Sequence, residues 1–192
     1  MEELANTISI KEAMSIKLDV AKPEEWKMLS QIRLKALKTD PTAFFGNEHP
    51  PTPAEEDEKK WRSLLENKKR FFIFAKNDSG IVGCVAALLD DSDIEPSDAV
   101  WQLRWAYIDP GLRHCGIGER MYRESLKEIR LRDGRKVIGY ILKANENFTA
   151  VLALNKKLGF REVEKHAYAK THYIKVELDL TNPKVLKKLG IH

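Results

Sequence analysis

The chain has 192 residues and a formal net charge of +4, with 43% hydrophobic and 32% charged residues. This composition is typical of a soluble globular protein, and the length fits a single domain with a buried core. Two cysteines are too few for a disulfide scaffold, which favours a reducing, cytoplasmic compartment. The acidic N-terminus differs from a signal peptide, and the longest apolar run is too short to span a bilayer. We therefore expect no membrane contact, and the scattered Lys and Arg residues argue against nucleic acid.

The first predicted elements follow a flexible polar leader at residues 1–13. Residues 14–20 alternate apolar and polar side chains, which predicts a half-buried strand. A helix is expected from Pro23 to Asp40, because a first-turn proline precedes an apolar stripe at helical spacing. A proline-rich loop follows, and residues 54–66 form a second predicted helix. Its acidic first turn complements the helix dipole, although an acidic wall for a cationic substrate is an alternative.

The rest of the chain alternates strand and helix patterns. Residues 71–76 and 81–89 predict a hairpin around an Asn-Asp-Ser-Gly turn. The later predicted strands are 100–108, 136–142, 161–166 and 169–180, and the later helices are 119–132, 147–158 and 183–189.

This order predicts an α/β fold with a mixed, mostly antiparallel central sheet of about six or seven strands and helices on both faces. We expect one domain at residues 14–180, followed by a basic C-terminal tail at residues 181–192.

The most informative segment joins the strand at residues 100–108 to the following helix. It reads Asp109-Pro110-Gly111-Leu112-Arg113-His114-Cys115-Gly116-Ile117-Gly118. A helix N-terminus carries unpaired N–H groups and about half a positive charge, so it can bind an anion. Gly118 would let the anion approach the backbone, Gly116 permits unusual backbone angles, and Arg113 adds a fixed charge. The segment predicts a phosphate-binding turn.

This turn has other interpretations. The two glycines could serve only a tight connection between strand and helix. A dinucleotide fingerprint needs a third glycine where Met121 stands. A P-loop needs a lysine where Glu119 follows Gly118. A nucleotide-bearing cofactor of another kind is therefore expected.

Two motifs resemble those of the GCN5-related N-acetyltransferases (GNAT). The family's acetyl-CoA motif is V-x-P-x-x-R/Q-x-x-G-x-G/A, and this chain has Ile108-x-Pro110-x-x-Arg113-x-x-Gly116-x-Gly118, with Ile in place of Val. A second family motif ends in L-G-F after a helix, and Leu158-Gly159-Phe160 matches it. Residues 33–44 are also similar to the first helix and loop of many members. The resemblance covers about residues 14–180 and implies the GNAT fold.

The resemblance implies transfer of an acetyl group from acetyl-CoA, without a metal, to a primary amine of a small molecule or peptide. The strands 100–108 and 136–142 would part, and the cofactor would enter the gap. The backbone of Ala106, Tyr107 and Ile108 would hold the pantetheine arm. The pyrophosphate would bind N–H groups of Arg113, His114, Cys115, Gly116, Ile117, Gly118 and Glu119.

The catalytic positions depart from the family pattern. Many members have a tyrosine acid where this chain has Asn155, and an asparagine where it has Phe148. Asparagine donates hydrogen bonds but does not release a proton near neutral pH. We therefore expect Asn155 to contact the cofactor, with a helix-surface residue as the alternative. The departing thiolate would take its proton from water or from another tyrosine, with Tyr107, Tyr140, Tyr168 and Tyr173 as candidates.

Two further candidates concern the acceptor. His49 lies in the loop that borders the acceptor site in the family, where a histidine could be a general base or simply exposed. Trp101, Trp105 and Tyr107 alternate along a strand and are expected on one face, lining an acceptor pocket or packing beneath helices. The histidines are scattered, without metal-ligand spacing.

The missing tyrosine also motivates an alternative function. A catalytically weak protein of this fold could bind acetyl-CoA as a sensor or scaffold. The expected partners are a small amine or peptide acceptor, and the chain could be a monomer or a homodimer.

Overall fold

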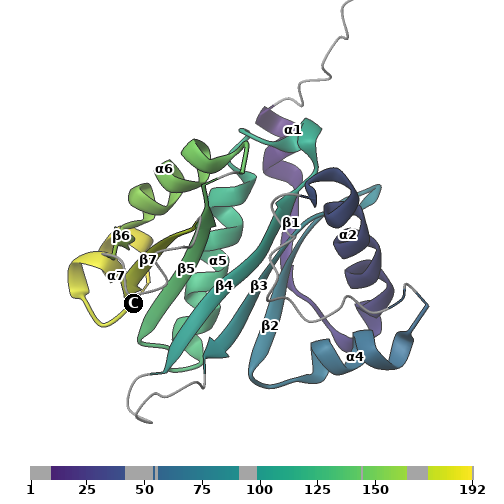
Figure 1. Ribbon diagram of the computed structural model, residues 1–192, viewed down its shortest axis with the longest axis horizontal. Coiled ribbons are helices and arrows are strands. Elements are labelled where there is room, and N and C mark those ends of the chain that lie inside the picture. The colour runs from purple at the N-terminus through teal and green to yellow at the C-terminus, as the bar shows by residue number, and fades with distance from the viewer. Residues whose placement is uncertain are drawn as a thin grey trace, which may run out of the picture.

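The computed structural model describes residues 10–41, 54, 56–90, 99–143, 145–163 and 173–191. The strands form one central sheet, and the helices pack around it (Figure 1). In chain order the elements are α1 (Ile10–Ser15), β1 (Lys17–Val20), the 3-10 helix η1 (Pro23–Glu25), α2 (Trp26–Thr39), α4 (Glu58–Glu66), β2 (Arg70–Asn77), β3 (Gly80–Asp90), β4 (Val100–Ile108), the 3-10 helix η2 (Pro110–Leu112), α5 (Ile117–Leu131), β5 (Lys136–Leu142), α6 (Phe148–Leu158), β6 (Arg161–Glu162), β7 (Tyr173–Asp179) and α7 (Pro183–Leu189).

The described strands form one seven-stranded sheet in the order β1-β2-β3-β4-β5-β7-β6. Neighbouring strands run antiparallel except β4 and β5, which are parallel. A parallel pair needs a crossover connection, and α5 provides it. The predicted mixed, mostly antiparallel sheet is therefore confirmed.

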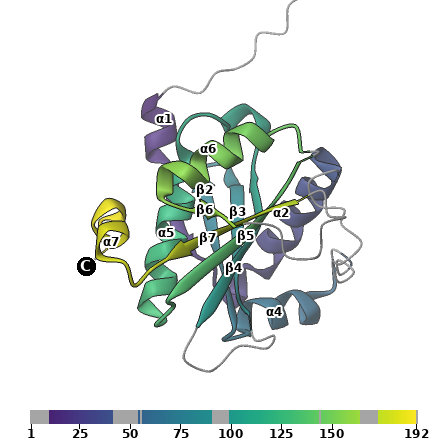
Figure 2. The same cartoon turned by 60° about the vertical axis from the view of Figure 1, so that its left-hand side comes forward.

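Helices cover both faces of the sheet, as Figure 2 shows from a second side. On one face, α2 and α4 pack through Leu29 and Trp61, which are fully buried against Phe74 of β2. On the other face, α5 packs through Met121 and Ile129, and α1, α6 and α7 add to the same cluster. Helices α2 and α5 bury the apolar stripes that their sequences predict, whereas α1 lies partly in the segment predicted as a flexible leader.

Strand β4 contains a β-bulge at Trp105. The pairing of β3 with β4 shifts by one residue between Cys84 and Ala86, and Trp105 has a φ of 55°. An extra residue reverses the alternation of side chains along a strand. Trp101 therefore faces the α5 side, whereas Trp105 and Tyr107 face the α2 side. The prediction that these three aromatic residues share one face is wrong.

The N-terminal strand begins later than predicted. Helix α1 covers Ile10–Ser15, so β1 starts at Lys17 and Met14 belongs to the helix. Ala13 and Ile16 are buried, while Met14 is 70% exposed. Ala13 therefore lies on the buried side of α1, Met14 lies on its exposed side, and Ile16 is buried just after the helix ends.

Two other elements are shorter than predicted. Helix α4 begins at Glu58 because the Asp57 carboxylate caps it by accepting the Lys60 N–H at 3.2 Å. Strand β6 has two residues, and β7 is described from Tyr173 onward. Residues 164–172, which the sequence assigned in part to these strands, lie outside the described residues.

The C-terminal helix α7 lies where it was predicted. Leu189 and Ile191 are buried in the cluster on the α5 side. Arg123 of α5 donates to the carbonyl oxygens of Lys188 and Leu189 at 3.3 and 3.5 Å. These contacts hold the segment after β7 against α5, while the proposed domain boundary at residue 180 stays a prediction.

Candidate functional site

The parallel strands β4 and β5 part halfway along their length. In the described sheet four residue pairs join them, ending at Leu103 and Gly139. Strand β4 nevertheless runs on to Ile108, and β5 runs on to Leu142. The bulge at Trp105 lies just beyond the last pair, where a bulge bends its strand. The end of β4 therefore presents backbone N–H and C=O groups to the gap, as an added strand would require.

A cavity of about 380 Å³ lies at this gap. It is lined by the end of β4, the turn before α5, the first turns of α5, and α6 with the loop before it. Among the predicted cofactor-binding residues, those in the lining are Ala106, Tyr107, Ile108, Arg113, His114, Gly116, Gly118 and Glu119. Ile117 is buried in the core and Cys115 packs against it, so neither is in the lining.

Small residues make up much of the lining. Gly116 and Gly118 contribute from the turn, and Ala150 and Ala153 contribute from α6. A Cβ atom on Gly118 would lie 3.3 Å from Ile108 Cδ1, which is tighter than an ordinary van der Waals contact. The cavity is therefore a slot that larger side chains would narrow.

The turn before α5 leaves N–H groups open. His114 and Gly116 have left-handed backbones, with φ of 62° and 79°. Gly116 is the N-cap, so α5 begins at Ile117, two residues before the predicted start. The first bond of the helix joins the Arg120 N–H to the Gly116 carbonyl at 3.1 Å. The N–H groups of residues 117–119 precede this bond and have no partner within the helix. Such a set suits an anion.

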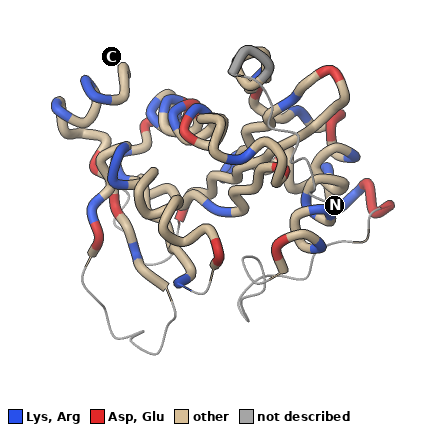
Figure 3. The backbone as a smooth tube through the Cα atoms, turned by 90° about the horizontal axis from the view of Figure 1, so that it is seen from above, with Lys and Arg blue, Asp and Glu red and all other residues tan. Residues whose placement is uncertain are grey.

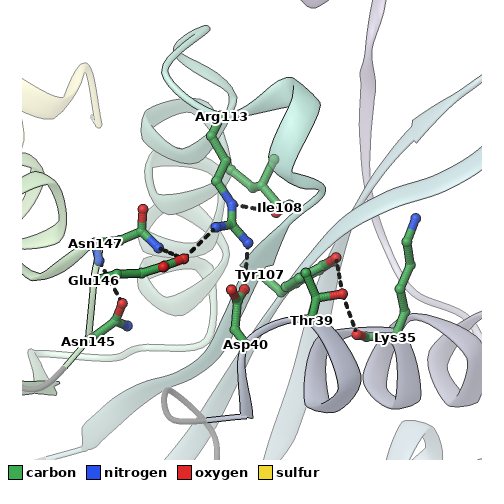
Figure 4. Close-up of polar contacts among 9 residues, drawn as sticks. All are labelled: Lys35, Thr39, Asp40, Tyr107, Ile108, Arg113, Asn145, Glu146 and Asn147. Carbon is green, nitrogen blue, oxygen red and sulfur yellow. Dashed lines mark hydrogen bonds and ion pairs between the residues drawn. The ribbon is translucent and has the colours of Figure 1, made fainter. Parts of the chain in front are cut away.

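The side chain of Arg113 bonds to protein groups. Its Nε donates to the Ile108 carbonyl at 2.9 Å, and Nη2 donates to the Asp40 carboxylate at 2.5 Å (Figure 4). Nη1 lies 3.6 Å from a carboxylate oxygen of Glu146. The structure places this charge between two acids at the cavity wall, and its expected approach to a phosphate stays a prediction.

Helix α2 reaches the same region through neighbouring side chains (Figure 4). Lys35 Nζ forms an ion pair with Asp109 at 2.6 Å, and the Tyr107 hydroxyl donates to Thr39 Oγ1 at 3.4 Å. Lys35 and Thr39 are four residues apart and so lie on one helix face. Together with Asp40, they tie the end of α2 to the end of β4 and the turn.

The opposite wall comes from α6 and the loop before it. Asn145 and Asn147 line the cavity, and the Asn147 N–H donates to Asn145 Oδ1 at 2.8 Å. Lys157 also lines the cavity and pairs with Glu119 at 2.5 Å. Hydrogen bonds from Lys157, and then from Arg123, lower the pKa of Glu119. Lys157 therefore stands at this wall with its carboxylate partner.

Asn155 is buried within α6. It is 3% exposed, and its Nδ2 donates to the Val151 carbonyl at 2.8 Å within α6. The alternative of a helix-surface residue is therefore wrong. Asn155 is also absent from the cavity lining, so its contact with the cofactor stays a prediction.

The remaining candidates fall into two groups. His49 and Tyr168 lie outside the described residues. Among the other tyrosines proposed as proton donors, Tyr107 lines the cavity, while Tyr140 and Tyr173 do not. Burial raises the pKa of the Tyr107 hydroxyl, which keeps it protonated.

Several lining residues were missed by sequence reasoning: Asp40, Tyr122, Asn145 and Asn147. Tyr122 follows Gly118 by four residues, so helical spacing places both on one face and could have indicated it. Burial raises the pKa of Tyr122 to about 12. Asp40 and the two asparagines gave no comparable signal, because their approach to the turn depends on how α2 and α6 pack.

Charges of both signs are interspersed along the chain, and basic residues gather on α7, which carries Lys184, Lys187 and Lys188 (Figure 3). Within the described residues, no group of three or more His, Cys, Asp or Glu side chains is placed to hold a metal ion. In the same part of the chain, every helix is too short or too polar to cross a membrane.

Comparison with protein families gives one match over most of this region. The model of the acetyltransferase (GNAT) family matches residues 34–160, which include the end of α2, the turn and α6. No curated protein sequence matches the chain.

Solved structures share the fold at low sequence identity. The chain is similar to yncA from Salmonella typhimurium, solved with its cofactor acetyl-CoA, with a TM-score of 0.67 and 13% identity over 86% of this chain and 94% of that one. The PaiA N-acetyltransferase from Thermoplasma acidophilum, in complex with coenzyme A, has a TM-score of 0.62 and 17% identity, covering 86% and 99% of the two chains. A ribosomal-protein-alanine N-acetyltransferase from Brucella melitensis has a TM-score of 0.66 and 18% identity, covering 85% and 99%.

Proposed function

Because the chain belongs to the GNAT family of acetyltransferases, we propose that it transfers an acetyl group from acetyl-CoA to a primary amine of a small molecule or peptide by direct attack. One observation carries the proposal. The strands β4 and β5 part beside a cavity of about 380 Å³, and the motif turn lines that cavity.

The residues around the cavity fit acetyl-CoA. The backbone of Ala106, Tyr107 and Ile108 would hold the pantetheine arm along the open side of β4. The N–H groups of residues 117–119 would receive the pyrophosphate. Gly118 supports this assignment, because it has no side chain to fill the narrow space in front of these N–H groups. A Cβ there would lie 3.3 Å from Ile108 Cδ1. Structural neighbours whose names include acetyl-CoA or coenzyme A support the same choice of donor.

The protein's own groups would assist the reaction in two ways. When bound, acetyl-CoA supplies an activated thioester, and the attacking amine must be neutral. Backbone N–H groups at the open end of β4 can stabilise negative charge on the acyl oxygen. A side chain or water must then protonate the thiolate that leaves.

We assign the protonating role to Tyr107. Among the described tyrosines that the sequence put forward, it is the one in the cavity lining. Its raised pKa keeps the hydroxyl protonated, and turning the hydroxyl away from Thr39 Oγ1, 3.4 Å distant, would free its one proton for the thiolate. Asn155, at the position of the family's tyrosine, is engaged within α6.

Two measurements test the proposed function. Calorimetry with coenzyme A reports donor binding, and release of coenzyme A from acetyl-CoA over a panel of amines and peptides reports turnover. Binding with turnover is the expected result. Binding without turnover across a broad panel would favour the sensor or scaffold, which the Asn155 position motivates. Absence of binding would overturn both functions.

A further inference from the structure

The structure assigns to Asp40 a role in positioning the donor, exerted through Arg113; the inference rests on the proposed function. Asp40 follows the last residue of α2, and its carboxylate accepts from Arg113 Nη2 at 2.5 Å. The two side chains are 12% and 17% exposed. A charge-assisted bond with so little solvent competition holds its partners in one geometry.

The anchor for this bond is rigid. The Asp40 N–H donates to the Ala36 carbonyl at 2.9 Å, so α2 fixes the backbone of Asp40. The ion pair of Lys35 with Asp109 holds the same end of α2 to the turn at a second point. A guanidinium bound to Asp40 is therefore held relative to β4 as well as to α2.

Arg113 passes this constraint to the N–H groups that would meet the pyrophosphate. Its Nε donates to the Ile108 carbonyl, which closes the segment between Ile108 and Arg113 into a ring. Of the residues that follow, His114 and Gly116 adopt left-handed backbones before α5 begins. Fixing the start of this segment fixes the direction of the N–H groups at residues 117–119. Preorganised donors bind an anion without the cost of ordering them.

The second acid near Arg113 provides a contrast. Glu146 lies 3.6 Å from Nη1 and is 73% exposed. An exposed ion pair at this distance contributes little. Both acids face the same guanidinium, but of the two only Asp40 forms a short bond that is largely shielded from solvent. Substituting each acid in turn therefore separates positioning from simple loss of negative charge.

The key variant is Asp40→Asn, with the dissociation constant for coenzyme A as the readout. If Asp40 positions the turn, the affinity falls about tenfold, as expected for a lost charge-assisted bond. If Arg113 instead serves as a phosphate ligand that Asp40 restrains, freeing it tightens binding. The direction of the change in coenzyme A affinity distinguishes the two roles, and tighter or unchanged binding by Asp40→Asn overturns the inference. Glu146→Gln is expected to leave the affinity equal or higher, and a loss equal to that of Asp40→Asn overturns it as well.

Two further comparisons exclude a general loss of structure. Pantetheine lacks the pyrophosphate, so Asp40→Asn is expected to leave pantetheine binding unchanged, and an equal loss for both ligands overturns the inference. Arg113→Gln is also combined with Asp40→Asn, because two amides can restore a neutral bond. The double variant is expected to bind coenzyme A more tightly than the product of the single losses predicts; an additive result counts against the inference.

The control is Asp19→Asn, the same substitution at an exposed residue of β1 that lies 3.5 Å from Lys76. It is expected to bind coenzyme A like the unmodified protein. If the unmodified protein itself fails to bind coenzyme A, the proposed function fails. If it binds and Asp40→Asn binds equally well, the inference alone fails.

Discussion

Gly118 and Ile108 lie so close across the turn that a Cβ on Gly118 would stand 3.3 Å from Ile108 Cδ1. The end of β4 and the first turn of α5 thus approach each other at the point where the cavity is lined by both. Space rather than a left-handed backbone angle favours a glycine here.

Gly118→Ala is expected to weaken coenzyme A binding about tenfold while changing stability by less than about 1 kcal/mol. Alanine favours a helix over glycine by about that amount, which offsets the tight contact with Ile108. Calorimetry and chemical denaturation measure the two effects. Gly111→Ala is the matched control, because a Cβ there meets nothing within 4 Å. Equal affinities for the two variants would contradict the assignment of the slot.

Asn155→Ala is expected to destabilise the protein by about 1 kcal/mol and to leave coenzyme A affinity unchanged. The variant loses the buried bond to the Val151 carbonyl but no part of the cavity lining. Thr149→Ala, at an exposed position of α6, serves as the control. A clearly raised dissociation constant for coenzyme A in Asn155→Ala would support the contact predicted from the sequence.

Tyr107→Phe is expected to lower kcat about a hundredfold without changing coenzyme A affinity, because a positioned acid contributes by that order. Tyr140→Phe is the control, since that tyrosine is 49% exposed on β5 and outside the lining. Steady-state rates with an accepted amine give the comparison. An unchanged kcat in Tyr107→Phe would assign protonation of the thiolate to water.

The free energy of unfolding is expected to fall as pH rises from about 9 towards 12. Burial raises the pKa of Cys84 from 9.0 to about 12, and that of Tyr122 from 10.0 to about 12. The unfolded chain therefore releases these protons at lower pH than the folded chain, which favours unfolding. The stabilisation from these two protonated groups is complete below pH 9 and is lost as the pH rises through their folded pKa values of about 12. Chemical denaturation of the protein and of Cys84→Ala between pH 8 and 11.5 measures the free energy of unfolding against pH. Equal slopes of this free energy for the two proteins would contradict the role of Cys84.

Local signals explain why much of the fold could be predicted. Strand β4 was predicted with its observed bounds, and so was β5, because each is an apolar run between clear turn signals. Gly159 ends α6 in a left-handed conformation with φ of 102°, as a glycine after a helix predicts. The motif turn was likewise contained within a few consecutive residues.

The bulge at Trp105 could not be predicted, because it depends on distant partners. The Arg33 guanidinium lies 4.2 Å from the centre of the Trp105 ring, and the Phe72 ring lies 5.8 Å from it. The bond between Asp40 and Arg113 joins residues 73 positions apart. Neither contact leaves a periodic pattern in the sequence. The pairing of Asp40 with Arg113 is therefore visible only in the structure, where α2 packs beside the turn.

The four residue pairs between β4 and β5 have a consequence for cooperative unfolding. Strands β1 to β4 and strands β5 to β7 meet along a short ladder, so the free protein has little backbone cohesion at the middle of its sheet. A donor whose amides bond along the gap would lengthen that ladder. Its binding would add to stability by mass action, and it would add backbone bonds between two halves that share the buried cluster on the α5 side.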